Sequence, residues 1–315
     1  MAHPILRFGL IAALAAPLAA APPLPDPNSL LATRRVLFLT GAESDHHIAP
    51  RANAVALAQR LKSSLGFTLD LADHPAALTS ADLARYDLIV ASYVPSIDTQ
   101  AAKPFGKALK QWLAEGNKGF VGLHSTGANS PGQWEWFRDS VLSMRYREHM
   151  DGEQRGTVRI SADAGIRALP VLAGLPEQAS LGCEWYSFDL PPKAAAAPTW
   201  PQCQVLYALD EGSLKLKDPM GYHPAAWIRT DANGNRFFYT LMAHSDAGSL
   251  SEFFQGLVMR GLEYASGYRS VTTLRGERPL TRIGPTGRSW IWRIEAEDGW
   301  PRFFVVDGRE SGLGR

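Results

Sequence analysis

The sequence predicts an α/β fold: a flavodoxin-like, doubly wound, mostly parallel sheet with helices on both faces, plus added β-hairpins. Short apolar runs alternate with helical patterns over residues 35–123, which is typical of βαβ units. The apolar runs are continuous, as expected for strands that are covered on both faces. The 315-residue chain is 45% hydrophobic and 20% charged, a composition typical of soluble globular proteins.

The parallel part of the sheet is expected in the first half of the chain. Apolar runs bounded by Gly or polar residues predict the strands, and apolar residues at helical spacing predict the helices between them. Thr79 or Ser80 is expected to cap the second helix, and Gly116 to end the third. We predict strands over 35–40, 67–71, 88–91 and 120–123, and helices over 52–65, 79–85 and 103–115.

The second half is richer in short strands. The turn sequence Asp231-Ala-Asn-Gly-Asn235 lies between two strand-like runs and predicts a β-hairpin. Residues 134–146 are aromatic and rich in Arg, and we interpret them as a helix. After residue 270 the pattern weakens, so a small hairpin, a poorly ordered extension and a truncated domain all remain open. The predicted strands are 157–160, 185–189, 204–209, 225–229 and 236–241, and the last helix is 250–264.

The N-terminus has the features of a secretory signal peptide. Arg7 precedes the apolar run 8–16, and small residues follow at 19–21. The run is too short for a good transmembrane span, although a membrane-tethering helix is the alternative. We expect a periplasmic or secreted protein with no nucleic-acid or membrane partner after cleavage, because the formal charge of +1 falls to zero without Arg7. The expected units are a signal peptide (1–21), a linker (22–34), a domain (35–268) and a C-terminal extension of unknown structure (269–315).

A polar corner follows the fourth predicted strand. His124 and Ser125 come directly after the apolar run that ends at Leu123, and Gly127 then allows a tight turn or a positive φ. Ligands of open α/β sheets bind at the carboxyl ends of the strands. The sequence therefore places a candidate site here. In the alternative interpretation, His124 caps the strand and Ser125 begins a turn.

Several histidines are expected beyond strand or helix ends, where a binding crevice forms. Converging imidazoles are good ligands for Zn²⁺ or another transition metal, and the candidate ligands are His46, His124 and His149. No H-E-x-x-H spacing supports a metal, and no cofactor is strictly required. Binding of sugar hydroxyls or proton transfer explains the same residues. The candidate histidines are His46, His47, His124, His149 and His244.

Glu184 and its aromatic neighbours form a second candidate region. A carboxyl group beside Tyr186 is a plausible general acid or base, or an ordinary strand edge. Trp136 and Tyr186 have rings that could stack on a sugar, although large aromatic residues more often pack in the core. Ser125 lacks the G-x-S-x-G context of a nucleophile. Without a cysteine at this corner, a glutamine amidotransferase is not expected.

The chain has two cysteines, Cys183 and Cys203. After export they would meet an oxidising compartment, where a disulfide is plausible. Two buried thiols explain the same pair. Their spacing matches no metal motif.

Together, these segments resemble the trehalose-utilisation (ThuA-like) family, a variant of the class I glutamine amidotransferase-like fold in which a Gly-x-His-Ser corner replaces the nucleophile. The resemblance implies carbohydrate metabolism and places His124, His149, Glu184 and His244 in the pocket. The export signal and the tail after residue 270 depart from the family pattern. The matching stretches are 36–41 with His46 and His47, 119–125, 136–137, 146–149, 174–177, 184–186, 223–224, 227–229, 238–240 before His244, and 253–264.

The leading hypothesis is an exported enzyme that acts on a small-molecule carbohydrate, such as a keto-glycoside, by acid–base or metal-assisted chemistry. His124, Glu184 and His244 would be catalytic. The alternative is a non-catalytic carbohydrate-binding module on the same scaffold, since a fold does not imply an activity. The residues expected to bind substrate are His47, Ser125, Trp136, His149 and Tyr186.

Overall fold

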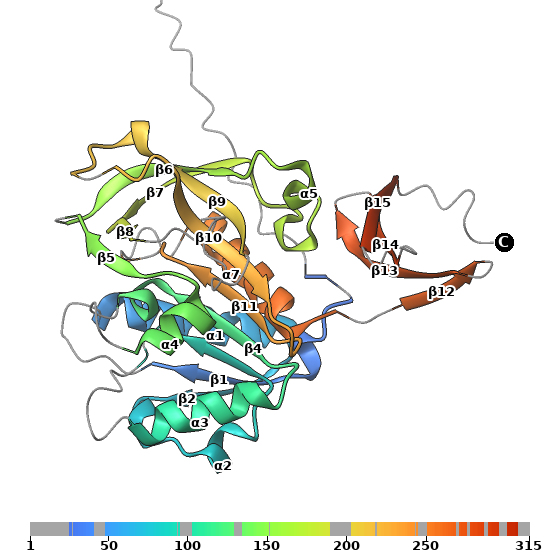
Figure 1. Ribbon diagram of the computed structural model, residues 1–315, viewed down its shortest axis with the longest axis horizontal. Helices are drawn as coiled ribbons and strands as arrows, with labels where there is room; N and C mark the ends of the chain where they lie inside the picture. Colours follow the sequence, from blue (N-terminus) through green and yellow to red (C-terminus); the bar gives the residue numbers. More distant parts are fainter. Residues whose placement is uncertain are drawn as a thin grey trace, which may run out of the picture.

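The computed structural model places most of the chain between residues 25 and 307 (Figure 1). The predicted signal peptide, His46, His47 and the loop 191–201 lie outside the described residues. Among the helices of the described part, none combines the length and the apolar character that a membrane crossing requires. The described residues are 25–26, 28–40, 48–92, 94, 103–128, 134–150, 152–189, 203–217, 219–242, 244, 251–268, 271–275, 278–286, 289–295 and 301–307.

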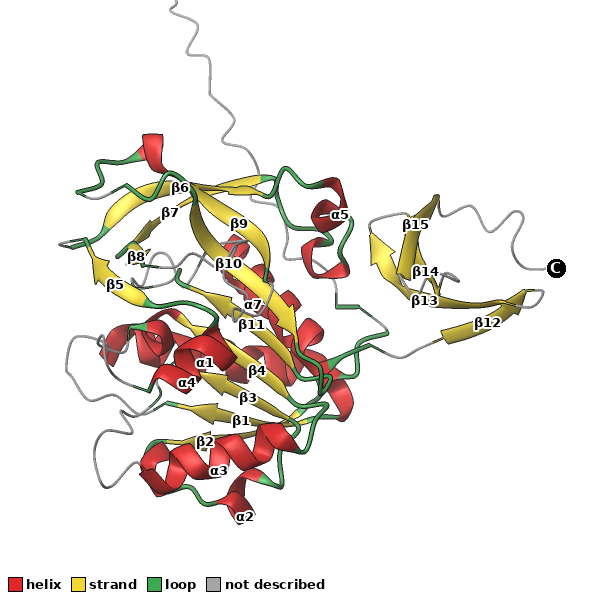
Figure 2. Cartoon of the chain, viewed as in Figure 1, coloured by secondary structure: helices red, strands yellow, loops and turns green. Residues whose placement is uncertain are grey.

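The predicted fold class is confirmed. Neighbouring parallel strands run in the order β2-β1-β3-β4-β11, the order of flavodoxin-like sheets (Figure 2). Nearly all of their apolar side chains are buried, which explains the continuous apolar runs in the sequence. These strands are β1 (Arg35–Leu39), β2 (Thr68–Ala72), β3 (Leu88–Ala91), β4 (Gly119–Leu123) and β11 (Arg236–Thr240).

An antiparallel extension continues the same sheet beyond β11, in the order β10-β9-β6-β7. The predicted hairpin joins β10 to β11, and the Asp231 carboxylate accepts hydrogen bonds from the amides of Asn233 and Asn235 within its turn. The edge strand β7 was not predicted, because its residues Gln178–Cys183 show little apolar alternation. The extension strands are β6 (Gln154–Ile160), β7, β9 (Gln204–Asp210) and β10 (His223–Thr230).

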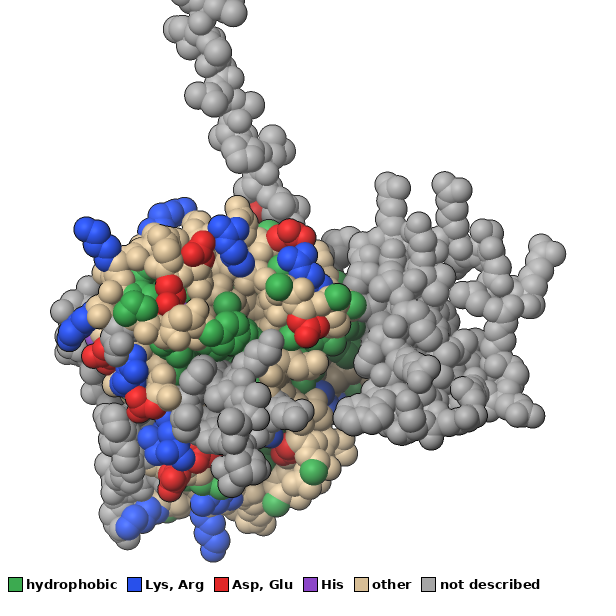
Figure 3. Space-filling view, turned by 45° about the horizontal axis from the view of Figure 1, so that its top comes forward, with side chains coloured by type: hydrophobic (Ala, Val, Ile, Leu, Met, Phe, Trp, Pro, Cys, Tyr) green, Lys and Arg blue, Asp and Glu red, His purple; other side chains and the backbone are tan. Residues whose placement is uncertain are grey.

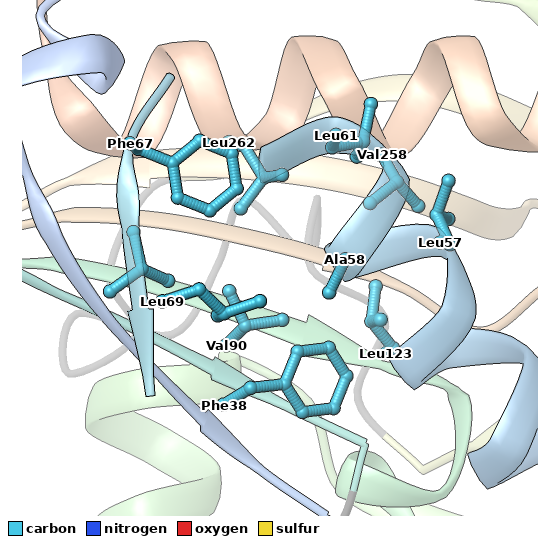
Figure 4. Close-up of a pocket in the computed structure, with 11 residues that line it drawn as sticks. Phe38, Leu57, Ala58, Leu61, Phe67, Leu69, Val90, Leu123, Val258 and Leu262 are labelled. Atoms are coloured by element: carbon cyan, nitrogen blue, oxygen red, sulfur yellow. The ribbon is translucent and has the colours of Figure 1, made fainter. Parts of the chain in front are cut away.

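Helices cover both faces of the parallel strands. On one face, α1 (Ile48–Leu65) and α7 (Glu252–Ser266) enclose an apolar pocket over β1 to β4 (Figure 4). Leu123, the last residue of β4, points into this pocket and anchors the strand end. On the other face, Phe120 meets Phe137 edge to face at 5.7 Å.

The second face carries α3 (Lys103–Ala114). The predicted stop is confirmed, because the helix ends at Ala114 and Gly116 follows with a φ of 77°. Short helical segments occur on this face and elsewhere in the described chain. The Lys110 ammonium lies over the Trp136 ring of α4, so that α3 and α4 are neighbours. Thr79 and Asp82 form a capping box at the start of α2. The shorter segments are η1 (Leu31–Thr33), η3 (Pro75–Ala77), α2 (Ser80–Leu83), η4 (His124–Gly127), α4 (Glu135–Phe137), the π-helix η5 (Arg138–Leu142), α5 (Ala164–Arg167), η6 (Pro170–Leu172) and η7 (Glu211–Ser213).

Two smaller sheets complete the fold. The helix predicted over 134–146 is wrong in its second half: the helical turns end at Leu142, and β5 (Tyr146–His149) pairs with β8 (Tyr186–Phe188). Beyond α7, antiparallel strands in the order β12-β13-β14-β15 form a separate sheet. These strands are β12 (Val271–Arg275), β13 (Arg278–Thr286), β14 (Ser289–Glu295) and β15 (Pro301–Asp307).

Candidate active site

The site begins where β4 ends. His124 follows Leu123 with φ 39°, in the left-handed region that side chains other than Gly rarely adopt. Such strain persists where the surrounding structure enforces it, and it concentrates at functional sites. The Tyr239 hydroxyl of β11 donates to the His124 carbonyl at 2.7 Å and so holds the turn.

Glycines on either side of this turn make room for the Tyr239 ring. A Cβ on Gly122 would lie 2.8 Å from the ring, and one on Gly127 would meet the hydroxyl oxygen and lie 2.8 Å from the carbon that bears it. Of the two roles that the sequence allowed for Gly127, the structure shows the tight turn, and the positive φ occurs at His124. Gly127 is required for close approach, because no larger residue fits against Tyr239.

The His124 ring is buried and held at both nitrogens. Leu123 pairs with Thr240 in the parallel register, which brings Leu241 beside His124. The ring Nδ1 lies 2.5 Å from the Leu241 carbonyl oxygen, so Nδ1 carries the proton and donates it. This tautomer leaves a lone pair on Nε2, which accepts the hydroxyl of Tyr186 at 2.8 Å.

Glu184 lies at the centre of the site, among three histidines. It follows directly after β7, which ends at Cys183. The ends of β7 and β11 lie close together, because the Cys183 thiol is 3.5 Å from the Leu241 carbonyl oxygen. Its Oε2 lies 3.4 Å from His244 Nε2 and 4.0 Å from His124 Nε2. Its Oε1 lies 3.5 Å from His149 Nδ1. Only 14% of its side chain is exposed, so this largely buried carboxylate lies among three imidazoles.

His244 is oriented by a carboxylate that the sequence analysis missed. Its Nδ1 lies 3.0 Å from Glu153 Oε1, so its Nε2 is directed at Glu184. A carboxylate that fixes the tautomer and direction of an imidazole is a recurring feature of catalytic and metal-binding histidines. Nothing marks Glu153 in the sequence, because it lies 91 positions from His244.

Tyr186 is a hydrogen-bond donor in the floor of the site. Burial, together with Tyr239 and the charge of Glu184, raises the pKa of Tyr186 well above its usual value. The phenol therefore stays protonated at neutral pH. His223 is buried behind Tyr186: its Nε2 lies 2.8 Å from the Tyr186 carbonyl oxygen, and its Nδ1 lies 3.0 Å from Glu211 Oε1.

His149 lies opposite Tyr186 in the pairing of β5 with β8. Its Nδ1 is 2.9 Å from the Met150 carbonyl, and 42% of its side chain is exposed. Beside it, burial and then the charges of Glu184 and Glu148 raise the pKa of Tyr146 to about 12. His149 thus marks the solvent side of the site, while His124 and Tyr186 form its floor.

Two other candidates from the sequence have partners elsewhere. Ser125 donates its hydroxyl to the carbonyl of Ser92, a contact that commits the proton which a nucleophilic serine would give to a base. Trp136 lies against the Trp134 ring at 5.3 Å and under the Lys110 ammonium.

The cysteines are free thiols, so the disulfide alternative is wrong. Burial raises the pKa of the Cys203 thiol to about 11. Cys203 is therefore a protonated packing residue at neutral pH. Cys183 is buried beside Leu241.

The arrangement offers two kinds of chemistry. His124, Glu184 and His244 each present a donor atom, and these atoms lie within 4.8 Å of one another. Imidazole and carboxylate groups at this spacing can pass protons. The same atoms are ligands that a transition metal accepts. The predicted ligands His124 and His149 both lie at the site.

Neither basic nor acidic side chains dominate the visible surface. On the face drawn in Figure 3, basic and acidic side chains of the described residues are interspersed. This distribution agrees with the small formal charge of the chain.

Comparisons with solved structures identify the fold. A ThuA-like protein from Bacteroides uniformis matches at a TM-score of 0.59 and 21% identity, over 73% of this chain and 90% of the other. Two weaker matches have TM-scores of 0.45: the β-galactosidase of Bacillus circulans sp. alkalophilus (13% identity, 87% of this chain, 40% of the other) and the CTPS glutaminase domain of Trypanosoma brucei with bound acivicin (11% identity, 73% and 93%).

The comparison with curated proteins gave no match. The model of the ThuA family, described as trehalose utilisation, matches residues 35–265. This range contains every residue of the site described above and stops within α7, before the C-terminal sheet. The chain therefore belongs to the ThuA (trehalose utilisation) family.

Proposed function

We propose that this protein is an enzyme that cleaves a keto-glycoside by acid–base chemistry at His124, Glu184 and His244. The observation that carries the proposal is the chain of contacts from Glu153 through His244 to Glu184, with 3.0 Å and 3.4 Å between the paired atoms. The His244 imidazole is held by the Glu153 carboxylate and faces the Glu184 carboxylate, so it is positioned to take and return a proton.

A keto-glycoside suits this machinery because a carbonyl acidifies the neighbouring C–H bond. His244 Nε2 takes that proton, and the C–H electrons form the C=C bond of an enolate. The Tyr186 hydroxyl, which is protonated at neutral pH and donates to His124 Nε2 in the structure, turns from this nitrogen to donate to the enolate oxygen. Glu153 and Glu184 stabilise the positive charge that His244 acquires.

The second half of the reaction expels the leaving group. The enolate oxygen re-forms the carbonyl, and the electrons of the enolate C=C bond form a new C=C bond to the next carbon, which bears the glycosidic oxygen. The glycosidic C–O bond breaks, and its electrons leave with the oxygen. The departing oxygen takes the proton from the His244 imidazolium, so the products are an unsaturated ketone and an alcohol. Addition of water to the unsaturated ketone completes a net hydrolysis.

The sugar substrate is supported by the family, which is described as trehalose utilisation. The choice of a carbonyl-bearing sugar is supported by the contacts of Ser125. Ser125 has its hydroxyl proton on Ser92, so a covalent route through this serine is disfavoured, whereas proton abstraction beside a carbonyl requires no nucleophile. A non-catalytic sugar-binding module remains the second candidate. The burial of His124 and Glu184 favours catalysis, because binding of sugar hydroxyls gains little from buried, proton-sharing groups.

The test is a turnover screen over keto-glycosides and their unoxidised parents, with products followed by chromatography. We expect turnover of keto-glycosides alone, and a loss of about 10²–10⁴-fold in kcat for Glu184→Gln and His244→Gln. Glu177→Gln and His74→Ala are matched controls, because both residues lie away from the site and should leave turnover unchanged. Equal activity of Glu184→Gln and wild type would contradict the proposal.

We also propose that the protein acts after export. The support is the N-terminal pattern of Arg7, the apolar run 8–16 and the small residues at 19–21. Intact-mass measurement of protein from a periplasmic extract tests this directly. A mass that lacks about the first 20 residues is expected, and a full-length mass in the cytoplasmic fraction would contradict it.

A further inference from the structure

We infer that His124 Nε2, His244 Nε2 and Glu184 Oε2 are the ligands of a single divalent transition-metal ion, such as Zn²⁺. This inference rests on the proposed function only for its consequence in catalysis. The ligand set itself follows from the geometry. It replaces the set expected from sequence, in which His46 and His149 accompanied His124.

The donor atoms have the spacing of a metal site. Around a tetrahedral ion with bonds of about 2.0–2.1 Å, ligand atoms lie about 3.3 Å apart. Glu184 Oε2 is 3.4 Å from His244 Nε2 and 4.0 Å from His124 Nε2, and all three donors lie within 4.8 Å. Small side-chain rotations would draw the wider pair together.

Both histidines have the outer contacts that metal-binding imidazoles require. His124 Nδ1 donates to the Leu241 carbonyl, and His244 Nδ1 faces the Glu153 carboxylate. Each contact places the proton on Nδ1 and turns the Nε2 lone pair toward Glu184. Metal-ligating histidines almost always donate their other N–H to a carbonyl or a carboxylate in this way.

The composition of the set selects the class of metal. Two neutral imidazoles and one carboxylate suit Zn²⁺, Fe²⁺ or Mn²⁺, whereas Ca²⁺ and Mg²⁺ prefer oxygen ligands throughout. The neutral tautomer of His124 is already fixed by Leu241. Burial of this ring also limits competition from water.

Metal binding would change the role of two neighbouring residues. The Tyr186 hydroxyl now donates to His124 Nε2, and an ion on that lone pair would free the hydroxyl for a substrate oxygen. His244 would then be a ligand. His149, with its Nδ1 held by Met150 and Glu184, is the imidazole left to act as the base.

The experiment is titration of the metal-free full-length protein with Zn²⁺ or Co²⁺ alone, followed by calorimetry and by the visible absorption of Co²⁺. We expect one ion per chain with a four-coordinate Co²⁺ spectrum, and no comparable binding of Mg²⁺. His124→Gln, Glu184→Gln and His244→Gln should each abolish tight binding. Glu153→Gln should weaken binding by about 10–100-fold, because it removes only an outer contact.

The controls separate ligands from neighbours. His149→Gln should retain the ion, because His149 is not among the ligands, while His74→Ala should retain both the ion and turnover. Thermal unfolding of each variant checks that the fold is intact. Absence of stoichiometric binding by the folded wild type would overturn the inference, and so would tight binding by folded Glu184→Gln.

The two proposals fail separately. Stoichiometric Co²⁺ binding without turnover of any keto-glycoside would support the metal site and contradict the proposed function. Turnover that survives complete removal of metal, in protein that binds no added Zn²⁺, would support the acid–base proposal and overturn the metal site.

Discussion

At the scale of single residues, the site depends on side chains whose hydrogen bonds fix where their protons lie. The Leu241 carbonyl and Glu153 each hold the Nδ1 proton of a histidine. Glu184 faces both Nε2 atoms from a largely buried position. The chemistry of the site therefore follows from tautomers that the backbone and one outer carboxylate impose.

Tyr186→Phe tests the hydrogen-bond donor in the site floor. We expect kcat on a keto-glycoside to fall by about 10²–10³-fold, because one donor to the developing enolate is lost. Affinity for Zn²⁺ should stay the same or increase, since the hydroxyl no longer occupies His124 Nε2. The exposed Tyr222→Phe serves as the control. Unchanged kcat in Tyr186→Phe would contradict the role of donor.

At the scale of elements, the turn after β4 and strand β11 form one unit. Tyr239 fills the space left by Gly122 and Gly127 and donates to the His124 carbonyl. The positive φ of His124 is thus supported from the neighbouring strand. Sequence periodicity cannot reveal this support, because β4 and β11 are far apart in the chain.

Gly127→Ala should destabilise the protein by about 1–3 kcal/mol, because the added methyl collides with the Tyr239 hydroxyl. The cost should be smaller in a Tyr239→Phe background, which removes the closest atom. Chemical denaturation of the four members of this double-mutant cycle measures the coupling. If the effects of Gly127→Ala and Tyr239→Phe on stability are additive, the contact with the Tyr239 hydroxyl is not what restricts residue 127 to glycine.

Glu211 holds the loop before β10 by hydrogen bonds. Burial raises the pKa of Glu211, but hydrogen bonds from the Met220 amide, His223 and the Gly221 amide outweigh it, so the pKa lies below the ordinary 4.5. A depressed pKa means that this stabilisation is complete above about pH 4.5 and is lost as the pH falls toward the folded-state value.

Glu211→Gln should therefore lower the free energy of unfolding by about 1–3 kcal/mol at pH 7. The difference from wild type should shrink as the pH falls below about 4.5. Denaturant unfolding between pH 7 and pH 3 measures this, with exposed Glu177→Gln as the control. A difference that stays constant over this range would show that the charge of Glu211 does not contribute.

At the scale of the whole molecule, the sheet brings distant segments to one end. His124 follows β4, Glu184 follows β7, His149 ends β5 and His244 lies beyond β11. These segments meet because β4 and β11 are parallel neighbours and the end of β7 lies over that of β11. The C-terminal sheet β12–β15 follows the family-matched range and supplies none of these residues.

The sequence predicted much of this arrangement. The parallel strands and the hairpin at Asp231–Asn235 followed from apolar runs and turn residues. Polar residues at strand ends indicated His124 and His244, and the resemblance to the ThuA-like family placed Glu184 beside them. Glu153 was missed because only three-dimensional contact with His244 reveals it. The strand β5 was not predicted, and the helix predicted before it extended too far, because these residues carry no alternation and the pairing of β5 with β8 determines its conformation.

The most direct measurement of the central claim is proton exchange at the carbon beside the carbonyl of a keto-glycoside in D₂O, followed by NMR. Wild-type protein should exchange this proton, because an imidazole held by Glu184 abstracts and returns it before or during cleavage. Glu184→Gln and His244→Gln should slow exchange by about 10²–10⁴-fold. Glu184→Gln and His244→Gln variants that exchange as fast as the folded wild type would contradict the account.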